Sequence, residues 1–121
     1  MNKSFLKFLP LLLLVGGCAT QKYTWNGYDD NLYAYYKNPA NKEKFLQHLK
    51  ETILIGEQNH NVPLGIYAEY GYLLYENQDF SDAIIYFQKE HDLWPESRFF
   101  MEKMIDNAKK MLSKSQPKGS V

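Results

Sequence analysis

The stretch Leu64–Ser97, LGIYAEYGYLLYENQDFSDAIIYFQKEHDLWPES, decides the fold of this chain of 121 residues. It predicts two antiparallel helices, Leu64–Asn77 and Phe80–Asp92, joined by a short polar turn. Proline then ends the second helix, because it cannot continue one. The spacing is Tyr-x2-Tyr-Gly-x2-Leu, then Ala-x3-Phe, then Pro, at Tyr67, Tyr70, Gly71, Leu74, Ala83, Phe87 and Pro95.

This spacing resembles the tetratricopeptide repeat, whose pattern is W-x2-L-G-x2-Y, then A-x3-F, then P. Gly71 and Ala83 are the small residues that let the two helices approach closely, and Leu74 and Phe87 fill the space between them. The departures are Tyr70 and Glu90, where Leu and Ala are commoner. The alternative is a generic helical hairpin whose spacing matches by chance.

One such hairpin cannot bury both its faces, so the flanking segments are expected to supply further helices. They are Asp29–Lys37, Asn41–Gln58 and Glu96–Lys114. The first two would form a degenerate hairpin with Ala34 in the place of Gly71, and the last would be a capping helix. The expected apolar faces are Phe45, Leu49, Thr52, Ile53 and Gly56 on the second helix, and Phe100, Met104, Ile105, Ala108 and Leu112 on the last. The predicted fold is therefore all-α, with tetratricopeptide-type hairpins over residues 28–115 and a flexible tail at 116–121.

The amino-terminal segment has the pattern of a secretory signal peptide: a positive start, then the apolar run Phe8–Val15. Val15-Gly16-Gly17-Cys18 resembles the bacterial lipobox, and Cys18 is the only cysteine of the chain. The resemblance implies a signal peptide at residues 1–17, acyl chains such as palmitate on Cys18, and a lipidated linker at 18–27. With Ala19 next, it also implies a bacterial outer membrane and a domain that faces the periplasm. The alternative is a plain signal peptide with a free thiol.

Charge and composition exclude other classes of partner. Lys3 and Lys7 leave with the signal peptide, so the mature chain has a small acidic excess. It carries no basic stripe, and nucleic acid is not an expected partner. No second cysteine remains to form an internal disulfide.

No constellation of residues predicts catalysis. His48, His60 and His91 have no second ligand at metal-binding spacing, and there is no nucleophile elbow or phosphate-binding loop. Asp29-Asp30 fits a helix start, where carboxylates favour the helix dipole. Glu90-His91-Asp92 is expected to be a solvated helix end. The sequence therefore predicts a protein that is not an enzyme and needs no cofactor, metal or small-molecule substrate.

A surface remains as the candidate functional site. In tetratricopeptide hairpins the first helix of each pair lines a concave groove. The register assigns to this groove Tyr72, Tyr75 and Glu76 from one helix, and Tyr28, Asn31 and Tyr35 from another. Tyr35, Tyr72 and Tyr75 would form an aromatic stripe, since tyrosine is a good interface anchor. The alternative is that these rings fill the core.

Two stretches at the start of the predicted domain, Tyr23–Tyr33 (YTWNGYDDNLY) and Tyr35–Pro39 (YYKNP), are similar to a family of short bacterial lipoproteins that carry a domain of unknown function. The resemblance implies an envelope complex, with a lipoprotein like the curli secretion channel as the first candidate partner. The expected function is a membrane-anchored protein–protein interaction module. The alternative is a pilotin-like lipoprotein or a regulator of cell-wall synthases.

Overall fold

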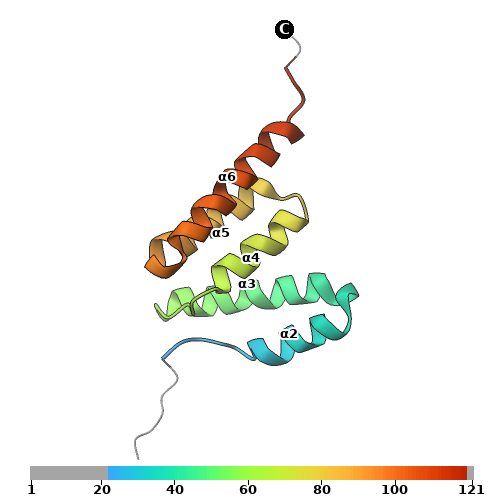
Figure 1. The fold of residues 1–121 in the computed structure, drawn as a ribbon. Coiled ribbons are helices and arrows are strands. Elements are labelled where there is room, and N and C mark those ends of the chain that lie inside the picture. Colours follow the sequence, from blue (N-terminus) through green and yellow to red (C-terminus); the bar gives the residue numbers. More distant parts are fainter. Residues whose placement is uncertain (1–21, 120–121) are drawn as a thin grey trace, which may run out of the picture.

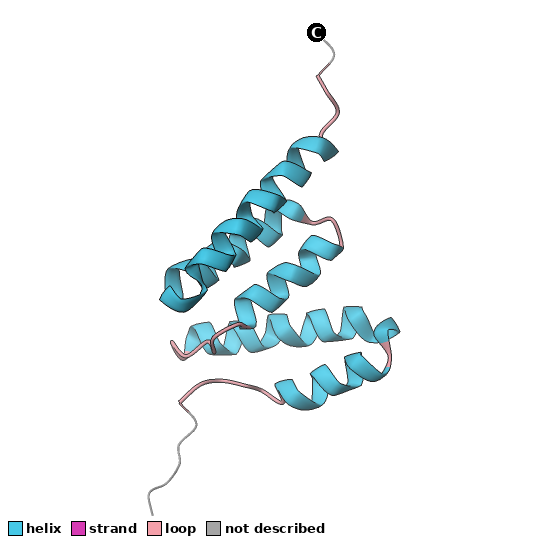
Figure 2. Cartoon of the chain, in the orientation of Figure 1, coloured by secondary structure: helices cyan, strands magenta, loops and turns pink. Residues whose placement is uncertain are grey.

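The computed structural model describes residues 22–119, and within this range the chain forms five α-helices and no strand. Consecutive helices run in opposite directions and stack into an elongated body (Figure 1). Figure 2 shows that helices dominate the described part. The bounds are α2 Tyr28–Lys37, α3 Lys42–Gln58, α4 Ile66–Glu76, α5 Phe80–Leu93 and α6 Arg98–Ser115, with short 3-10 turns at Pro39–Asn41 and Pro95–Ser97. The prediction of an all-helical fold is confirmed. The predicted signal peptide and Cys18 lie outside the described residues.

The hairpin of α4 and α5 depends on a close approach at Gly71. A Cβ atom built on Gly71 would lie 2.9 Å from ring carbons of Phe87 and 3.3 Å from the Ala83 carbonyl oxygen. Ala83 is fully buried, and Phe87 is buried against the same point. The glycine and the alanine therefore let the Phe87 ring lie between the helices, as predicted.

The hairpin of α2 and α3 is built differently. Ala34 is exposed, so it is not the counterpart of Gly71 that the sequence suggested. Aromatic stacking joins these helices instead: the rings of Tyr35 and Phe45 lie 5.1 Å apart and nearly parallel. The predicted inner face of α3 is confirmed, since Phe45, Leu49, Thr52, Ile53 and Gly56 are all buried. By contrast, α2 contributes no buried residue.

The capping helix α6 packs along α5, as expected. Its buried residues are Met101, Ile105 and Ala108. The prediction that Phe100 belongs to this face is wrong, because Phe100 is 60% exposed. Met101, Ile105 and Ala108 follow the i, i+4 and i+7 spacing of one helical face, and this face packs on α5. Phe100 precedes Met101 by one residue and therefore points away from that face.

Glu90 corrects a second expectation. It is fully buried rather than part of a solvated helix end. Its Oε1 atom accepts hydrogen bonds from the Gly65 backbone N–H (2.8 Å) and from the Ser97 hydroxyl (3.1 Å). The carboxylate of α5 therefore binds the amino-terminal end of α4 and the turn that leads into α6. Burial raises its pKa.

We predict that Gly71→Ala destabilises the protein. In an exposed helix interior, alanine is more favourable than glycine by about 1 kcal/mol. At position 71, however, the new Cβ atom meets the Phe87 ring, and overpacking of this kind costs about 1–3 kcal/mol. Urea unfolding followed by circular dichroism should show a net loss. Ala34→Gly is the control at an exposed site and should cost only about 0.5–1 kcal/mol. A stabilised Gly71→Ala protein would contradict the close approach.

We predict that Glu90→Ala costs about 1–3 kcal/mol, because it removes the acceptor of the Gly65 N–H and Ser97 hydroxyl. Glu90→Gln keeps an acceptor and tests the charge. Because the folded pKa of Glu90 is raised, the folded state holds this proton more tightly than the unfolded state. The wild type should therefore lose stability relative to Glu90→Gln as the pH rises from about 4.3 through that raised pKa. A difference independent of pH would show that the Glu90 carboxylate is not desolvated.

Candidate interaction surface

The exposed tyrosine of the predicted stripe is Tyr72, on the second half of α4. Its side chain is 49% exposed. Beside it, Lys42 at the start of α3 forms a salt bridge of 3.1 Å with Glu76. The charge of Glu76 raises the pKa of Tyr72, and Tyr35 of α2 also lies close enough to influence it. We call these four residues, Tyr35, Lys42, Tyr72 and Glu76, the Tyr72 surface. It joins an aromatic body, a phenol hydroxyl and both signs of charge.

The other predicted groove residues pack within the body. Tyr75 meets the edge of Phe80, with ring centroids 5.2 Å apart. The Tyr28 hydroxyl donates to the Glu69 carboxylate, whose pKa is raised by burial. Asn31 donates to the Gly27 carbonyl oxygen at 2.9 Å and so supports the start of α2. Tyr28, Tyr35 and Tyr75 therefore contribute to helix packing, while Tyr72 offers the larger free surface.

Exposed aromatic residues outside the predicted groove lie on α2 and α6. Tyr33 and Tyr36 are 61% and 79% exposed on α2. Phe99 and Phe100 are exposed at the start of α6. The i, i+3 and i+4 spacing of Tyr33, Tyr36 and Lys37 could have indicated a second face of α2, separate from the one that carries Tyr28 and Tyr35.

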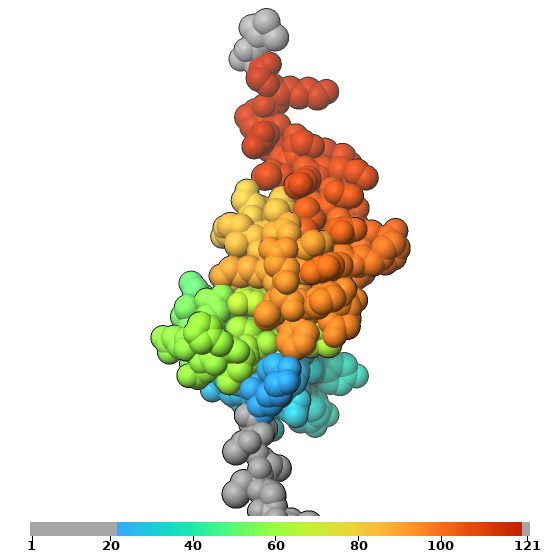
Figure 3. Space-filling view, turned by 90° about the vertical axis from the view of Figure 1, so that its left-hand side faces the viewer, coloured from blue at the N-terminus to red at the C-terminus, as the bar shows by residue number. Residues whose placement is uncertain are grey.

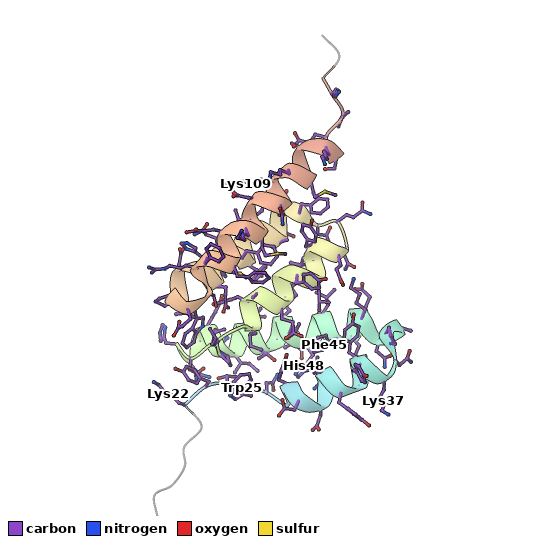
Figure 4. All side chains as sticks on the ribbon, viewed as in Figure 1. Lys22, Trp25, Lys37, Phe45, His48 and Lys109 are labelled. Carbon is purple, nitrogen blue, oxygen red and sulfur yellow. The ribbon has the colours of Figure 1, made fainter. Side chains whose placement is uncertain are left out.

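A cleft of about 460 Å³ lies where the segment before α2 crosses the ends of α3 and α5. The Tyr23 ring meets the Trp94 ring edge-on at 5.7 Å across this region. Thr24 is bound to Asn61 through its backbone N–H, which donates to the Asn61 carbonyl oxygen at 3.1 Å, and through its side chain. These contacts fix the segment that leads back toward Cys18 on the folded body. Figure 4 shows Lys22 and Trp25 of this segment at the lower edge of the molecule.

One wall of the cleft is a polar cluster that joins three helices. Glu57 of α3 accepts hydrogen bonds from Lys89 of α5 (2.7 Å) and from the Tyr67 hydroxyl of α4 (2.9 Å). Lys89 holds the pKa of Glu57 below its ordinary value. The Lys89 ammonium also lies over the rings of Tyr67 and Tyr86. Glu57 is thus committed to a structural ion pair.

The three histidines lie apart from one another in the fold. His91 bridges Asp92 (2.9 Å) and Glu102 (3.2 Å), which links α5 to α6, and those carboxylates raise its pKa. His60 lines the cleft, and His48 is half-buried on α3. Within residues 22–119, no group of three or more His, Cys, Asp or Glu side chains is placed to hold a metal ion. No helix in that range is both long and apolar enough to cross a bilayer.

Comparison with known proteins places the chain in a family. The model of the Domain of unknown function (DUF4810) matches residues 22–104, from the segment before α2 into α6. No curated protein and no solved structure matches the chain. The family match covers more than half of the sequence, and it confirms the resemblance to a family with a domain of unknown function. The chain belongs to the DUF4810 family.

Proposed function

We propose that this protein is a membrane-anchored interaction module that binds a protein partner in a bacterial envelope complex. The observation that carries the proposal is the Tyr72 surface, where a half-exposed tyrosine stands beside the Lys42–Glu76 ion pair. Tyrosine is enriched at binding hot spots because it offers a large apolar body and a polar tip at low entropic cost. The ion pair provides matching charges at the rim of such a contact.

The hairpin of α4 and α5 supports an assignment to the tetratricopeptide type. Five of the repeat-defining residues are buried between the helices, namely Tyr67, Gly71, Leu74, Ala83 and Phe87. Pro95 follows α5 at the repeat position for a helix stop. Helical repeats of this type commonly present a surface to a peptide segment of another protein.

We further propose that Cys18 carries acyl chains and anchors the protein in the outer membrane, facing the periplasm. Two or more acyl chains hold a protein stably on a bilayer, at about 0.8 kcal/mol per buried CH₂. Lys22 follows Cys18 by four positions, so the tether spans at most about 14 Å. The partner should therefore work close to the same membrane, and a curli-channel-like lipoprotein is our first candidate.

We predict that Tyr72→Ala weakens capture of this partner. Loss of a tyrosine hot spot costs about 2 kcal/mol or more, or roughly thirtyfold in affinity. The test is a pull-down of the full-length protein from detergent-solubilised membranes, with identification by mass spectrometry. A lipoprotein of the curli-channel type should be recovered with the wild type and depleted with the variant.

Ile85→Ala is the matched control, because Ile85 is exposed to a similar degree on α5. It should leave the recovered proteins unchanged. Urea unfolding should show that Tyr72→Ala folds as stably as the wild type. Unchanged recovery with the folded Tyr72→Ala protein would contradict the proposed surface. Recovery of a secretin or a peptidoglycan synthase instead would favour a pilotin-like or cell-wall-regulating function.

A further inference from the structure

We propose that the outer face of α2, formed by Tyr33, Tyr36 and Lys37, rests on the lipid surface of the membrane. We call it the α2 outer face. This inference rests on the proposed acyl anchor at Cys18 and deepens it. It assigns the side of the domain that faces the bilayer, and therefore the sides that stay free for a protein partner.

The α2 outer face is an exposed aromatic surface. Tyr36 is 79% exposed and Tyr33 is 61% exposed. Together with Leu32 and Asp29 they line a shallow hollow of about 310 Å³. The opposite side of the helix carries Tyr35, whose ring stacks on Phe45. The packed and the outer face of α2 are thus both aromatic.

The chemistry of this face fits a bilayer interface better than bulk water. Tyrosine rings are enriched at the level of lipid headgroups, where the ring is buried and the hydroxyl stays wet. The ammonium of Lys37 lies 5.4 Å from the centroid of the Tyr33 ring, and a lysine can place its stem along the interface with its charge outward. Asp29 and Asp30 in the first turn offset the charges of Lys37 and Lys22. The face is therefore close to neutral and suits zwitterionic headgroups.

The position of the tether supplies the second argument. Residues 22–27 and α2 lie at the same end of the body, and the carboxyl end of α6 lies at the other (Figure 1 and Figure 3). Figure 4 shows Lys22, Trp25 and Lys37 along that lower edge. The Thr24–Asn61 hydrogen bonds and the Tyr23–Trp94 contact hold the segment on the body. An anchor at Cys18, at most about 14 Å from Lys22, would therefore draw this end toward the lipid.

A competing apolar patch lies on α6. Phe99 and Phe100 are 73% and 60% exposed in the first turn of α6. Figure 1 shows this start of α6 above α3, whereas α2 lies below α3 at the lower edge, with residues 22–27. We therefore assign the bilayer contact to α2. The α6 patch serves as the alternative in the test below.

The test uses the full-length acylated protein in vesicles of phosphatidylethanolamine and phosphatidylcholine, whose headgroups are zwitterionic. Cys18 is the only cysteine, so once it is acylated an introduced cysteine is the single free thiol. An environment-sensitive fluorophore is attached to Tyr36→Cys, to Phe100→Cys and, as the matched exposed control, to Ile85→Cys. Quenching by spin-labelled lipid should be about twofold or more stronger at position 36 than at 85, because interfacial side chains lie within about 5–10 Å of the acyl boundary.

Each outcome decides a separate claim. Equal quenching at positions 36 and 85 would overturn the α2 contact, and so would stronger quenching at position 100, which would place the molecule on α6. Intact-mass spectrometry of the purified chain tests the anchor independently. An unacylated mass would refute the proposed anchor, whereas an acylated chain without quenching at position 36 would refute the orientation alone.

Discussion

The close contact between α4 and α5 at Gly71 is the constraint on which the rest of the structure depends. No side chain larger than hydrogen fits there without displacing the Phe87 ring. With α4 and α5 fixed in this way, α5 offers its other side to α6, and Glu90 at its end binds the starts of both neighbouring segments. The carboxyl-terminal helices therefore form one unit around α5.

The amino-terminal hairpin depends on a different kind of contact. It joins through large rings, with Tyr35 on Phe45 and Tyr28 reaching Glu69 of α4. Aromatic side chains can hold a short helix that buries no residue completely. The same helix keeps tyrosines on its outer side, so α2 is both a packing element and an exposed surface. In our proposals this dual character places α2 between the lipid and the rest of the module.

The spacing of residues in the sequence predicts correctly the contacts that lie within the hairpin of α4 and α5. The positions of Gly71, Ala83 and Phe87 follow from a pattern within one hairpin, and they are buried as expected. The prediction that Ala34 is the counterpart of Gly71 is wrong, because a pattern of small residues does not reveal that aromatic rings make the contact between α2 and α3. Phe100 and Met101 are adjacent apolar residues, so only the rotation of α6 about its axis, as it packs on α5, decides which of them is buried. Glu90 gave no local signal, since Gly65 lies 25 positions away. The stripe of Tyr35, Tyr72 and Tyr75 was likewise indistinguishable from core by register alone.

Native-state hydrogen exchange followed by NMR tests the central claim most directly, namely that the fold is built around the contact of α4 with α5. Amides in α4 and α5 should exchange only through global unfolding, because these helices bury the residues of the central contact. Amides of α2, which buries none, should exchange through a smaller opening at lower free energy. Equal protection of α2 and α4, or exchange of α4 and α5 before α2, would contradict this account.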